Sequence, residues 1–359
     1  MSIPFIRLKR SRQLVISWLL LLAGCVTEYQ PETLSLTPGL VVEGQITDQP
    51  GPYTVRLTRT GDYSNQGFNL LEQGATLTIE DNAGNRETLT EVAGGTYQTK
   101  ANGLRGLAGQ RYKLTILTKA GKRYESNAEL LTSAPPILKA YAEYRNEAIP
   151  GTPNRRQGWD VYIDTQDPET SGNFYRWDWV HYEPVSACAR VVENPRTNAY
   201  HDLYCCTFCW DIERCYNCLN VNSDASINGK VLSRQLITRV PFTSTQPYYL
   251  EIEQQAISQG AYTFWKSVRG LVNNTGGLFD PAPAMVQGNI RNIADAAEPV
   301  FGYFGATGIS VVPLRVNRSD VQGAPPAQPQ LLFRSPPDPC FPCENSLYRT
   351  SVTPRWWVF

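Results

Sequence analysis

Cysteine is the residue type with the clearest chemical potential in this chain of 359 residues, which contains nine cysteines. Eight of them lie in the C-terminal half: Cys188, Cys205, Cys206, Cys209, Cys215, Cys218, Cys340 and Cys343. Three Cys-x-x-Cys pairs, which begin at Cys206, Cys215 and Cys340, have the spacing of zinc knuckles. Only five residues separate the first two pairs, however, which is shorter than the span of a zinc ribbon. An even number of cysteines is also typical of a disulfide framework, whose pairing the sequence leaves open.

The ninth cysteine, Cys25, follows an N-terminal segment that is typical of export signals. Four basic residues come first: Arg7, Lys9, Arg10 and Arg12. Residues 14–22 then form an uncharged apolar run, shorter than the roughly 20 residues that span a bilayer. The run ends in Leu22-Ala23-Gly24-Cys25, which resembles the lipobox of bacterial lipoproteins. The alternative is an ordinary secretory signal with a coincidental cysteine.

The lipobox resemblance implies how the mature chain begins and where it resides. Residues 1–24 would be the signal peptide, and Cys25 would carry acyl chains that hold the protein on membrane lipid, at about 0.8 kcal/mol for each buried methylene. The polar residues 25–39 are predicted to form a tether. Because exported thiols meet oxidising conditions, export favours disulfides over zinc for the other eight cysteines. We expect no metal and no cofactor.

Other residue types that perform catalysis are sparse. The chain has no G-x-S-x-G, H-E-x-x-H, Walker or G-x-G-x-x-G motif. Its two histidines, His181 and His201, lie near the cysteines, so a mixed metal site is an alternative to ordinary hydrogen-bonded histidines. Asp160, Asp164 and Asp167 suggest either calcium ligands or solvated carboxylates. The sequence therefore favours a protein that is not an enzyme.

Aromatic residues offer a second kind of site. The chain has eight tryptophans, and strand alternation places Trp177 and Trp179 on one face. These two and Trp210 are candidates for an interface with a partner, because rigid aromatic side chains often anchor interfaces. Packing in a hydrophobic core is the alternative interpretation for the same side chains.

The composition indicates the fold class that must position these residues. Lysine and arginine together number 33, as do aspartate and glutamate, and this balance gives no support to nucleic-acid binding. With 26 prolines and 27 glycines the chain is predicted to be mainly β. Short alternating segments such as 75–79 and 112–117 predict an immunoglobulin-like β-sandwich over residues 40–133. A larger β-rich domain is expected over 137–359, with a disulfide-stapled, cysteine-rich insertion at 185–222.

One amphipathic helix is predicted in the second half. Ser258 can cap its N-terminus, and the run of Asn and Gly at 273–277 ends it. The helical spacing gives an apolar stripe: Ala261, Phe264, Trp265, Val268 and Leu271. We expect this stripe to pack on a sheet.

Several short phrases then occur in a recognisable order. They are Val41-Val42-Glu43-Gly44, Gly51-Pro52-Tyr53, Tyr124-Glu125-Ser126, Gly277-Leu278-Phe279-Asp280-Pro281-Ala282-Pro283, Gly288-Asn289-Ile290, Gly302-Tyr303-Phe304 and a closing Thr353-Pro354-Arg355-Trp356. Together they resemble the Bacteroidetes lipoprotein family known as domain of unknown function 4249 (DUF4249). Many members are encoded beside TonB-dependent transporters of the SusC type, and no catalytic residues are carried over.

The resemblance implies a function at the cell envelope. We expect an outer-membrane lipoprotein that faces the cell exterior and acts as a non-enzymatic accessory to a SusC-like TonB-dependent barrel, in substrate capture or gating. A structural, adhesive or assembly role in the envelope is the main alternative. An extracellular hydrolase is less favoured, because the paired carboxylates that it needs are not evident from the sequence.

Overall fold

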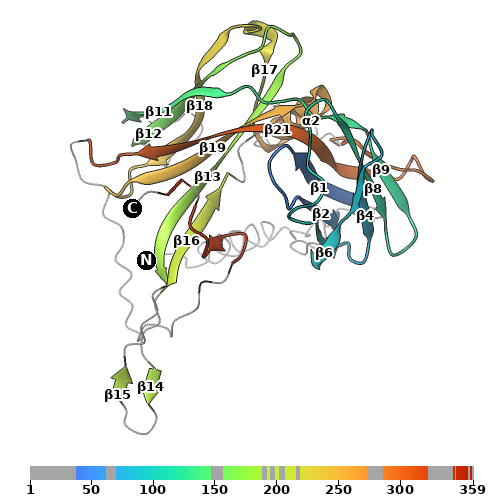
Figure 1. The fold of residues 1–359 in the computed structure, drawn as a ribbon, viewed down its shortest axis with the longest axis horizontal. Helices are drawn as coiled ribbons and strands as arrows, with labels where there is room; N and C mark the ends of the chain where they lie inside the picture. The colour runs from blue at the N-terminus through green and yellow to red at the C-terminus, as the bar shows by residue number, and fades with distance from the viewer. Residues whose placement is uncertain are drawn as a thin grey trace, which may run out of the picture. The chain divides into compact units, whose positions relative to one another are not determined.

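The computed structural model of the chain describes residues 38–61, 70–146, 157–187, 192–194, 199–201, 207–215, 219–273, 286–321, 343, 345–354 and 356–357. The described residues are mainly β, as the composition predicted, and the ribbon is drawn in Figure 1. The strands are β1 (Leu40–Thr47), β2 (Thr54–Arg59), β3 (Leu70–Leu71), β4 (Thr76–Asp81), β5 (Arg86–Thr88), β6 (Thr90–Ala93), β7 (Thr96–Gln98), β8 (Arg111–Leu117), β9 (Arg123–Ser126), β10 (Glu129–Leu130), β11 (Ile137–Arg145), β12 (Gly158–Gln166), β13 (Phe174–Ala187), β14 (Val192–Asn194), β15 (Ala199–His201), β16 (Thr207–Arg214), β17 (Asn220–Ser223), β18 (Val231–Pro241), β19 (Tyr248–Ile257), β20 (Ile290–Asn292), β21 (Val300–Val316) and β22 (Arg349–Thr350). The helices are the short 3-10 helix η2 (Asp224–Ser226) and the α-helix α2 (Gln259–Asn273).

The largest sheet joins the two ends of the described chain. Its strand order is β22-β16-β13-β19-β21-β1-β2-β7-β6. The long strand β21 pairs in parallel with β1 from Val300 to Thr307, and then antiparallel with β19 from Gly308 to Val316. Figure 1 shows β21 running past both neighbours in this way. N-terminal residues therefore share a continuous hydrogen-bonded sheet with residues that follow them by about 260 positions, such as Leu40 and Val300.

A second sheet, with the order β20-β9-β8-β4-β5, packs against the β1 end of the first. In β4 and β8 buried and exposed residues alternate, as the sequence pattern predicted, so that Leu77, Ile79 and Leu114 point into one core. Burial of each such side chain contributes roughly 1.5–3 kcal/mol. Phe304 of β21 and Ile290 of β20 complete this core from the C-terminal half. The immunoglobulin-like topology and the domain limits 40–133 remain predictions.

A second core lies between the three-stranded sheet β11-β12-β18 and the β13–β19–β21 part of the large sheet. Trp159, Val161 and Ile163 of β12 alternate into it and meet Trp177 of β13 and Leu250 of β19. This packing gives the β13–β19 pair one buried face, so its opposite face is the one that remains for α2 and for polar side chains.

The predicted helix is confirmed. The Ser258 hydroxyl accepts a hydrogen bond from the Ala261 backbone N–H at 3.1 Å, the bond of an N-cap, and α2 ends at Asn273. Ala261 packs with Val221 and Tyr303, whereas Phe264 and Trp265 are only half-buried beside them. Within the described ranges, no helix is both long and apolar enough to cross a membrane.

Candidate functional site

Two cavities lie beside α2 in the described part of the chain. Cavity A has a volume of about 660 Å³ and cavity B about 740 Å³. Both share the wall formed by Phe264, Leu271, Val286 and Tyr303. The apolar stripe of α2 therefore does not only pack on the sheet, as the sequence suggested, because Phe264 and Leu271 also line open space on its two sides.

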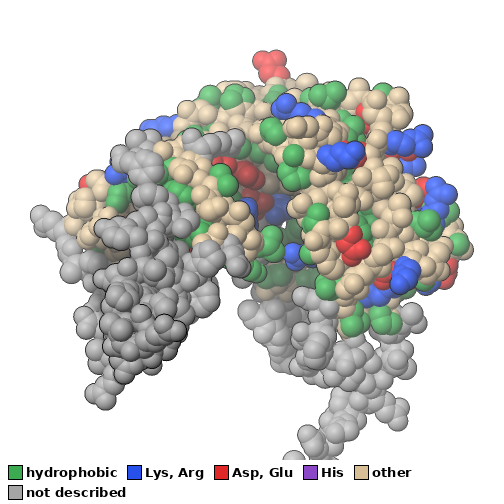
Figure 2. Space-filling model, turned by 60° about the horizontal axis from the view of Figure 1, so that its bottom comes forward, with side chains coloured by type: hydrophobic (Ala, Val, Ile, Leu, Met, Phe, Trp, Pro, Cys, Tyr) green, Lys and Arg blue, Asp and Glu red, His purple; other side chains and the backbone are tan. Residues whose placement is uncertain are grey.

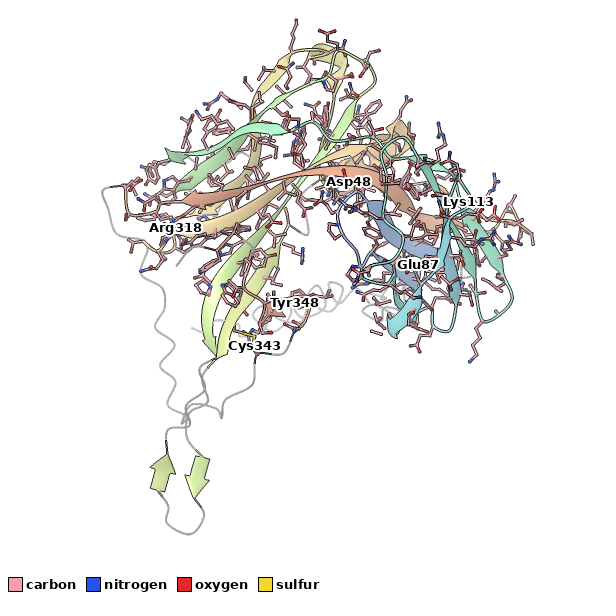
Figure 3. The ribbon with its side chains drawn as sticks, viewed as in Figure 1. Asp48, Glu87, Lys113, Arg318, Cys343 and Tyr348 are labelled. Atoms are coloured by element: carbon pink, nitrogen blue, oxygen red, sulfur yellow. A yellow bond between two sulfur atoms is a disulfide. The ribbon has the colours of Figure 1, made fainter. Side chains whose placement is uncertain are left out.

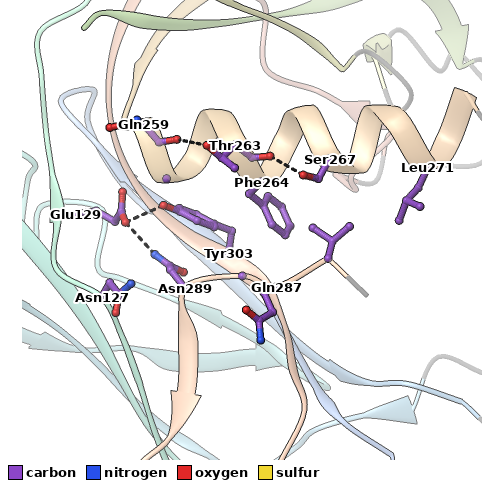
Figure 4. Close-up of a pocket in the computed structure, with 13 residues that line it drawn as sticks. Asn127, Glu129, Gln259, Thr263, Phe264, Ser267, Leu271, Gln287, Asn289 and Tyr303 are labelled. Carbon is purple, nitrogen blue, oxygen red and sulfur yellow. Dashed lines mark hydrogen bonds between the residues drawn. The ribbon is translucent and has the colours of Figure 1, made fainter. Parts of the chain in front are cut away.

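Cavity A has a polar but mostly uncharged lining (Figure 4). Gln259, Thr263 and Ser267 succeed one another at four-residue intervals along one face of α2 and border it. Asn289, next to the first residue of β20, faces them across the cavity, and Glu129 of β10 supplies the charged group in the lining. The amide and hydroxyl groups of this cavity can both donate and accept hydrogen bonds.

The Glu129 carboxylate is held by hydrogen bonds on both oxygens. Its Oε1 accepts from the Tyr303 hydroxyl at 2.7 Å and from the Asn289 amide at 3.1 Å, while Oε2 accepts from the Ser258 hydroxyl. Asn289 also bonds in both directions with the backbone of Phe304. Burial raises the pKa of Tyr303 above its usual value, so its hydroxyl remains a donor to Glu129. This buried network fixes the floor of cavity A and gives both oxygens of its carboxylate a hydrogen-bond donor.

Two glycines bring the residues of this network together. A Cβ atom on Gly288 would lie 1.5 Å from the Gly302 carbonyl oxygen, and one on Gly302 would lie 1.9 Å from the Val42 carbonyl oxygen. Gly302 also has a φ of +86°, which side chains other than glycine rarely adopt. Three of the recognisable phrases, around Val42, Gly288 and Gly302, thus meet in space. The phrase at 277–283 lies outside the described residues.

Cavity B combines apolar walls with a few charged side chains. Its apolar lining comes from β1, α2 and β21, with Val41, Trp265 and Phe301 among the contributors. Arg176 and Asp178 of β13 and Glu43 of β1 supply its charges: Arg176 is cationic, and Asp178 and Glu43 are acidic. A cavity of this size, mostly apolar with few polar groups, is typical of sites for small organic ligands.

Arg176 and Asp178 form an ion pair that is incompletely satisfied. Arg176 Nη2 lies 2.8 Å from Asp178 Oδ2, and the guanidinium lies 4.1 Å from the Trp265 ring centroid. Asp178 Oδ2 also accepts from the Gln255 amide at 3.2 Å. Among the described residues, however, Asp178 Oδ1 and Arg176 Nε have no hydrogen-bond partner although both atoms are buried.

Burial and neighbouring charges change the pKa values of Asp178 and of a carboxyl group beside it. Burial raises the pKa of the Asp178 carboxyl, and the Arg176 charge acts in the opposite direction. Glu253 lies directly across the β13–β19 pair from Asp178. Burial also raises the pKa of Glu253, and the charges of Asp178 and Glu251 add to that effect while Arg214 opposes it. Beside cavity B, three carboxyl groups of β13 and β19 (Asp178, Glu251 and Glu253) thus interact with the two guanidinium groups of Arg176 and Arg214.

The three tryptophans predicted as interface candidates lie in the interior. Trp177, Trp179 and Trp210 are 1%, 7% and 2% exposed, as the core-packing interpretation requires, and the Trp177 indole donates to Gln254 at 3.0 Å. Trp265, which the sequence placed only in an apolar helix stripe, borders cavity B instead. Spacing within α2 could not reveal that its ring meets Arg176, because Arg176 belongs to a distant strand.

The disulfide prediction is confirmed for one pair. Cys209 of β16 and Cys343 are bonded to each other, with their Cα atoms 5.8 Å apart, and Figure 3 shows Cys343 beside this strand. Cys215 is disulfide-bonded as well. The other predicted cysteines lie outside the described residues: Cys25, Cys188, Cys205, Cys206, Cys218 and Cys340. The bond between Cys209 and Cys343 removes both sulfurs from use as zinc-binding thiolates.

The three aspartates considered as calcium ligands each have protein partners. Asp160 is buried and paired with Arg239, Asp164 Oδ1 accepts from the Arg234 backbone N–H, and buried Asp167 accepts from the Tyr175 hydroxyl at 2.6 Å. Asp160 and Asp167 are therefore not solvated carboxylates, contrary to the favoured interpretation of the sequence. In the part of the chain that the structure describes, no group of three or more His, Cys, Asp or Glu residues is placed to hold a metal ion.

The histidine for which the structure shows a side chain also has partners. His181 stacks on Tyr248 with ring centroids 3.5 Å apart, and its Nδ1 lies 2.7 Å from the Tyr249 carbonyl oxygen. The His201 side chain lies outside the described part of the structure.

Comparison with known proteins places the chain in a family. No curated protein sequence matches it. A family model described as "Domain of unknown function (DUF4249)" matches residues 26–311, a span that contains the lining of both cavities. The resemblance found in the short phrases is thereby confirmed, and the chain belongs to the DUF4249 family.

Proposed function

We propose that this protein is a lipid-anchored outer-membrane lipoprotein that captures a small ligand at the cell surface for a SusC-like TonB-dependent transporter, without chemical change of the ligand. The observation that carries the capture role is cavity B, a hollow of about 740 Å³ with apolar walls and a few charged groups. The lipobox-like segment that ends at Cys25 supports the anchored location.

The construction of cavity B suits a capture protein. Most of its walls come from β1, β13, β21 and α2, which are regular elements joined by sheet pairing and by packing of the helix. A site on such elements is preformed, so that little conformational entropy is lost when a ligand binds. Residues 26–39 would connect acylated Cys25 to β1, one of the strands that line the cavity.

The partner is tested by purification from native membranes. The tagged full-length lipoprotein is extracted from outer membranes in a mild detergent, and the proteins that accompany it are identified and quantified by mass spectrometry. We expect a TonB-dependent barrel in near-stoichiometric amount. The same tag on an unrelated outer-membrane lipoprotein controls for non-specific recovery. An intact, abundant bait without a barrel would reject the transporter role, and recovery of other envelope proteins instead would favour the structural alternative.

The anchor is tested separately with Cys25→Ala. This substitution removes the thiol that would be acylated, so we expect no incorporation of labelled fatty acid and release of the protein from the membrane fraction. Loss of fatty acid labelling without any change in membrane association would show that another feature holds the protein there. Protease accessibility of intact cells, compared with lysed cells, reports whether the folded part faces the exterior.

A further inference from the structure

Cavity B borders a cluster of buried polar atoms that the described residues do not satisfy. Asp178 Oδ1 and Gln255 Oε1 are acceptors without a hydrogen-bond partner there, and Arg176 Nε is a donor without one. Arg176 and Gln255 face each other directly across the β13–β19 pair, so the three atoms belong to one neighbourhood. Buried polar groups in proteins are nearly always paired, so an unpaired carboxylate oxygen on a side chain that lines a cavity indicates a ligand that donates to it.

The charged side chains around these atoms indicate whether the ligand is a cation or an anion. Asp178 and Glu43 line the cavity with Arg176, whose charge the Asp178 carboxylate already balances. Glu253 lies opposite Asp178 and adds a further carboxyl group, and Glu251 is two residues away from it on the same strand. Figure 2 shows acidic side chains within a hollow of the molecule, with basic and apolar side chains beside them. The balance favours a cation over an anion.

The carboxylate is placed where a ligand can reach it. The Asp178 side chain is 20% exposed, although its Oδ1 atom is shielded. Asp178 itself belongs to the lining of the cavity. Trp265, Val268 and Phe301 provide apolar surface in the same cavity for the rest of the ligand.

We infer that cavity B binds an organic cation, in which a primary ammonium group on an apolar or aromatic body is held by Asp178. An ammonium group has three donors, one of which can serve Asp178 Oδ1, the open acceptor on a side chain that lines the cavity. This inference rests on the proposed function in that it names the chemical class of the captured ligand. Cavity A differs, since both oxygens of its buried carboxylate already accept hydrogen bonds from the protein.

A matched series of indoles tests the ligand class on the wild-type protein. The full-length lipoprotein, held in lipid nanodiscs, is titrated calorimetrically with tryptamine, tryptophol and indole-3-propionate, which differ in carrying an ammonium, a hydroxyl or a carboxylate group. We expect tryptamine to bind at least about tenfold more tightly than tryptophol, and indole-3-propionate not to bind. Equal binding of tryptamine and tryptophol, preference for the carboxylate, or no binding of any probe would overturn the inference. Empty nanodiscs measure the partition of each probe into lipid.

Substitutions in cavity B test whether Asp178 holds the ammonium group. Asp178→Asn keeps the side-chain shape but removes the charge, so we expect about a tenfold loss of tryptamine affinity with little change for tryptophol. Glu43→Gln changes an exposed residue of the same cavity and is expected to cause a smaller loss, about threefold. Glu169→Gln alters an exposed glutamate that is not part of the cavity lining, and serves as the control. Unchanged tryptamine binding in both cavity variants would contradict the assignment.

The outcomes separate this inference from the proposed function. Tryptamine binding to cavity B without a co-purifying barrel would retain the cation site and reject the transporter role. If a barrel co-purifies but the lipoprotein does not prefer tryptamine, the transporter role is retained and the cation site is rejected. Circular dichroism of each variant confirms that altered binding does not result from loss of folding.

Discussion

The two cavities beside α2 differ in how their buried carboxylates are used. In cavity A, Glu129 accepts hydrogen bonds from Tyr303, Asn289 and Ser258, so both of its oxygens are occupied. In cavity B, one oxygen of Asp178 is paired and the other has no partner among the described residues. A carboxylate in a cavity has a structural role when protein donors bond to both of its oxygens, and it is available to a ligand when one oxygen lacks a donor.

The cavities nevertheless depend on the same elements. Tyr303 and Phe264 form part of both walls, and β21 carries Tyr303 between them. The difference arises on the opposite walls, where β10 and the segment before β20 border cavity A while β1 and β13 border cavity B. The strand that faces α2 across each cavity therefore determines whether the carboxylate there has a structural or a ligand-binding role.

The substitution with the largest expected effect on stability should disrupt both cavities. In Gly302→Ala the new Cβ would lie 1.9 Å from the Val42 carbonyl oxygen, at a φ of +86°. We expect a loss of more than about 4 kcal/mol in the free energy of unfolding, or failure to fold, measured by urea denaturation. Gly84→Ala is the matched control, because its φ is +88° and nothing lies within 4 Å, so only backbone strain of about 1 kcal/mol is expected. Similar stability of the two variants would refute the close approach of β1 and β21.

The next effect tests whether Glu129 is structural. Glu129→Ala leaves the Tyr303 hydroxyl, the Asn289 amide and the Ser258 hydroxyl without their acceptor. We expect a loss of about 3 kcal/mol in the free energy of unfolding. Glu43→Ala, at an exposed position of cavity B, should change it by less than about 0.5 kcal/mol. If both substitutions had equally small effects, the contrast between the cavities would not hold.

A smaller effect is expected at the residue that joins α2 to the Glu129 network. Ser258→Ala removes the hydrogen bond from the Ala261 N–H and the donor to Glu129, so we expect a loss of about 1–2 kcal/mol by the same denaturation assay. Ser267→Ala on the exposed face of α2 removes only a bond to the Thr263 carbonyl and should be close to neutral. A neutral Ser258→Ala would show that the cap does not hold the helix in place.

The smallest effect concerns pH and the negative charge near cavity B. Burial raises the pKa of Glu253, and the neighbouring Asp178 and Glu251 charges raise it further against Arg214. Between the ordinary value of about 4.3 and the raised one, the folded protein binds more protons than the unfolded chain, so stability falls as the pH rises. Glu253→Gln should reduce this decrease, as measured by urea midpoints from about pH 4 upward. An unchanged dependence on pH would show that Glu253 does not cause it.

Sequence patterns were sufficient to predict those features that depend on interactions between residues close together in the chain. The cap and stripe of α2, and the alternation in β4 and β8, depend on residues a few positions apart, and all three were predicted correctly. The disulfide chemistry of Cys209 and Cys343 followed from the number of cysteines and the expected export, although their pairing did not. The phrases that carry the family resemblance were also visible without knowledge of the fold.

The cavities and the roles of their charges were decided only by the tertiary structure. Glu129 and Tyr303 are separated by 174 residues, and Asp178 and Gln255 by 77, so no local spacing relates them. Two of the tryptophans that looked suited to an interface, Trp177 and Trp179, were buried by the packing of β12 against β13 and β19, while Trp265 was left beside a cavity. A sequence determines which side chains can donate, accept or exclude water, but whether a buried oxygen finds a partner depends on which distant strand the fold brings to it.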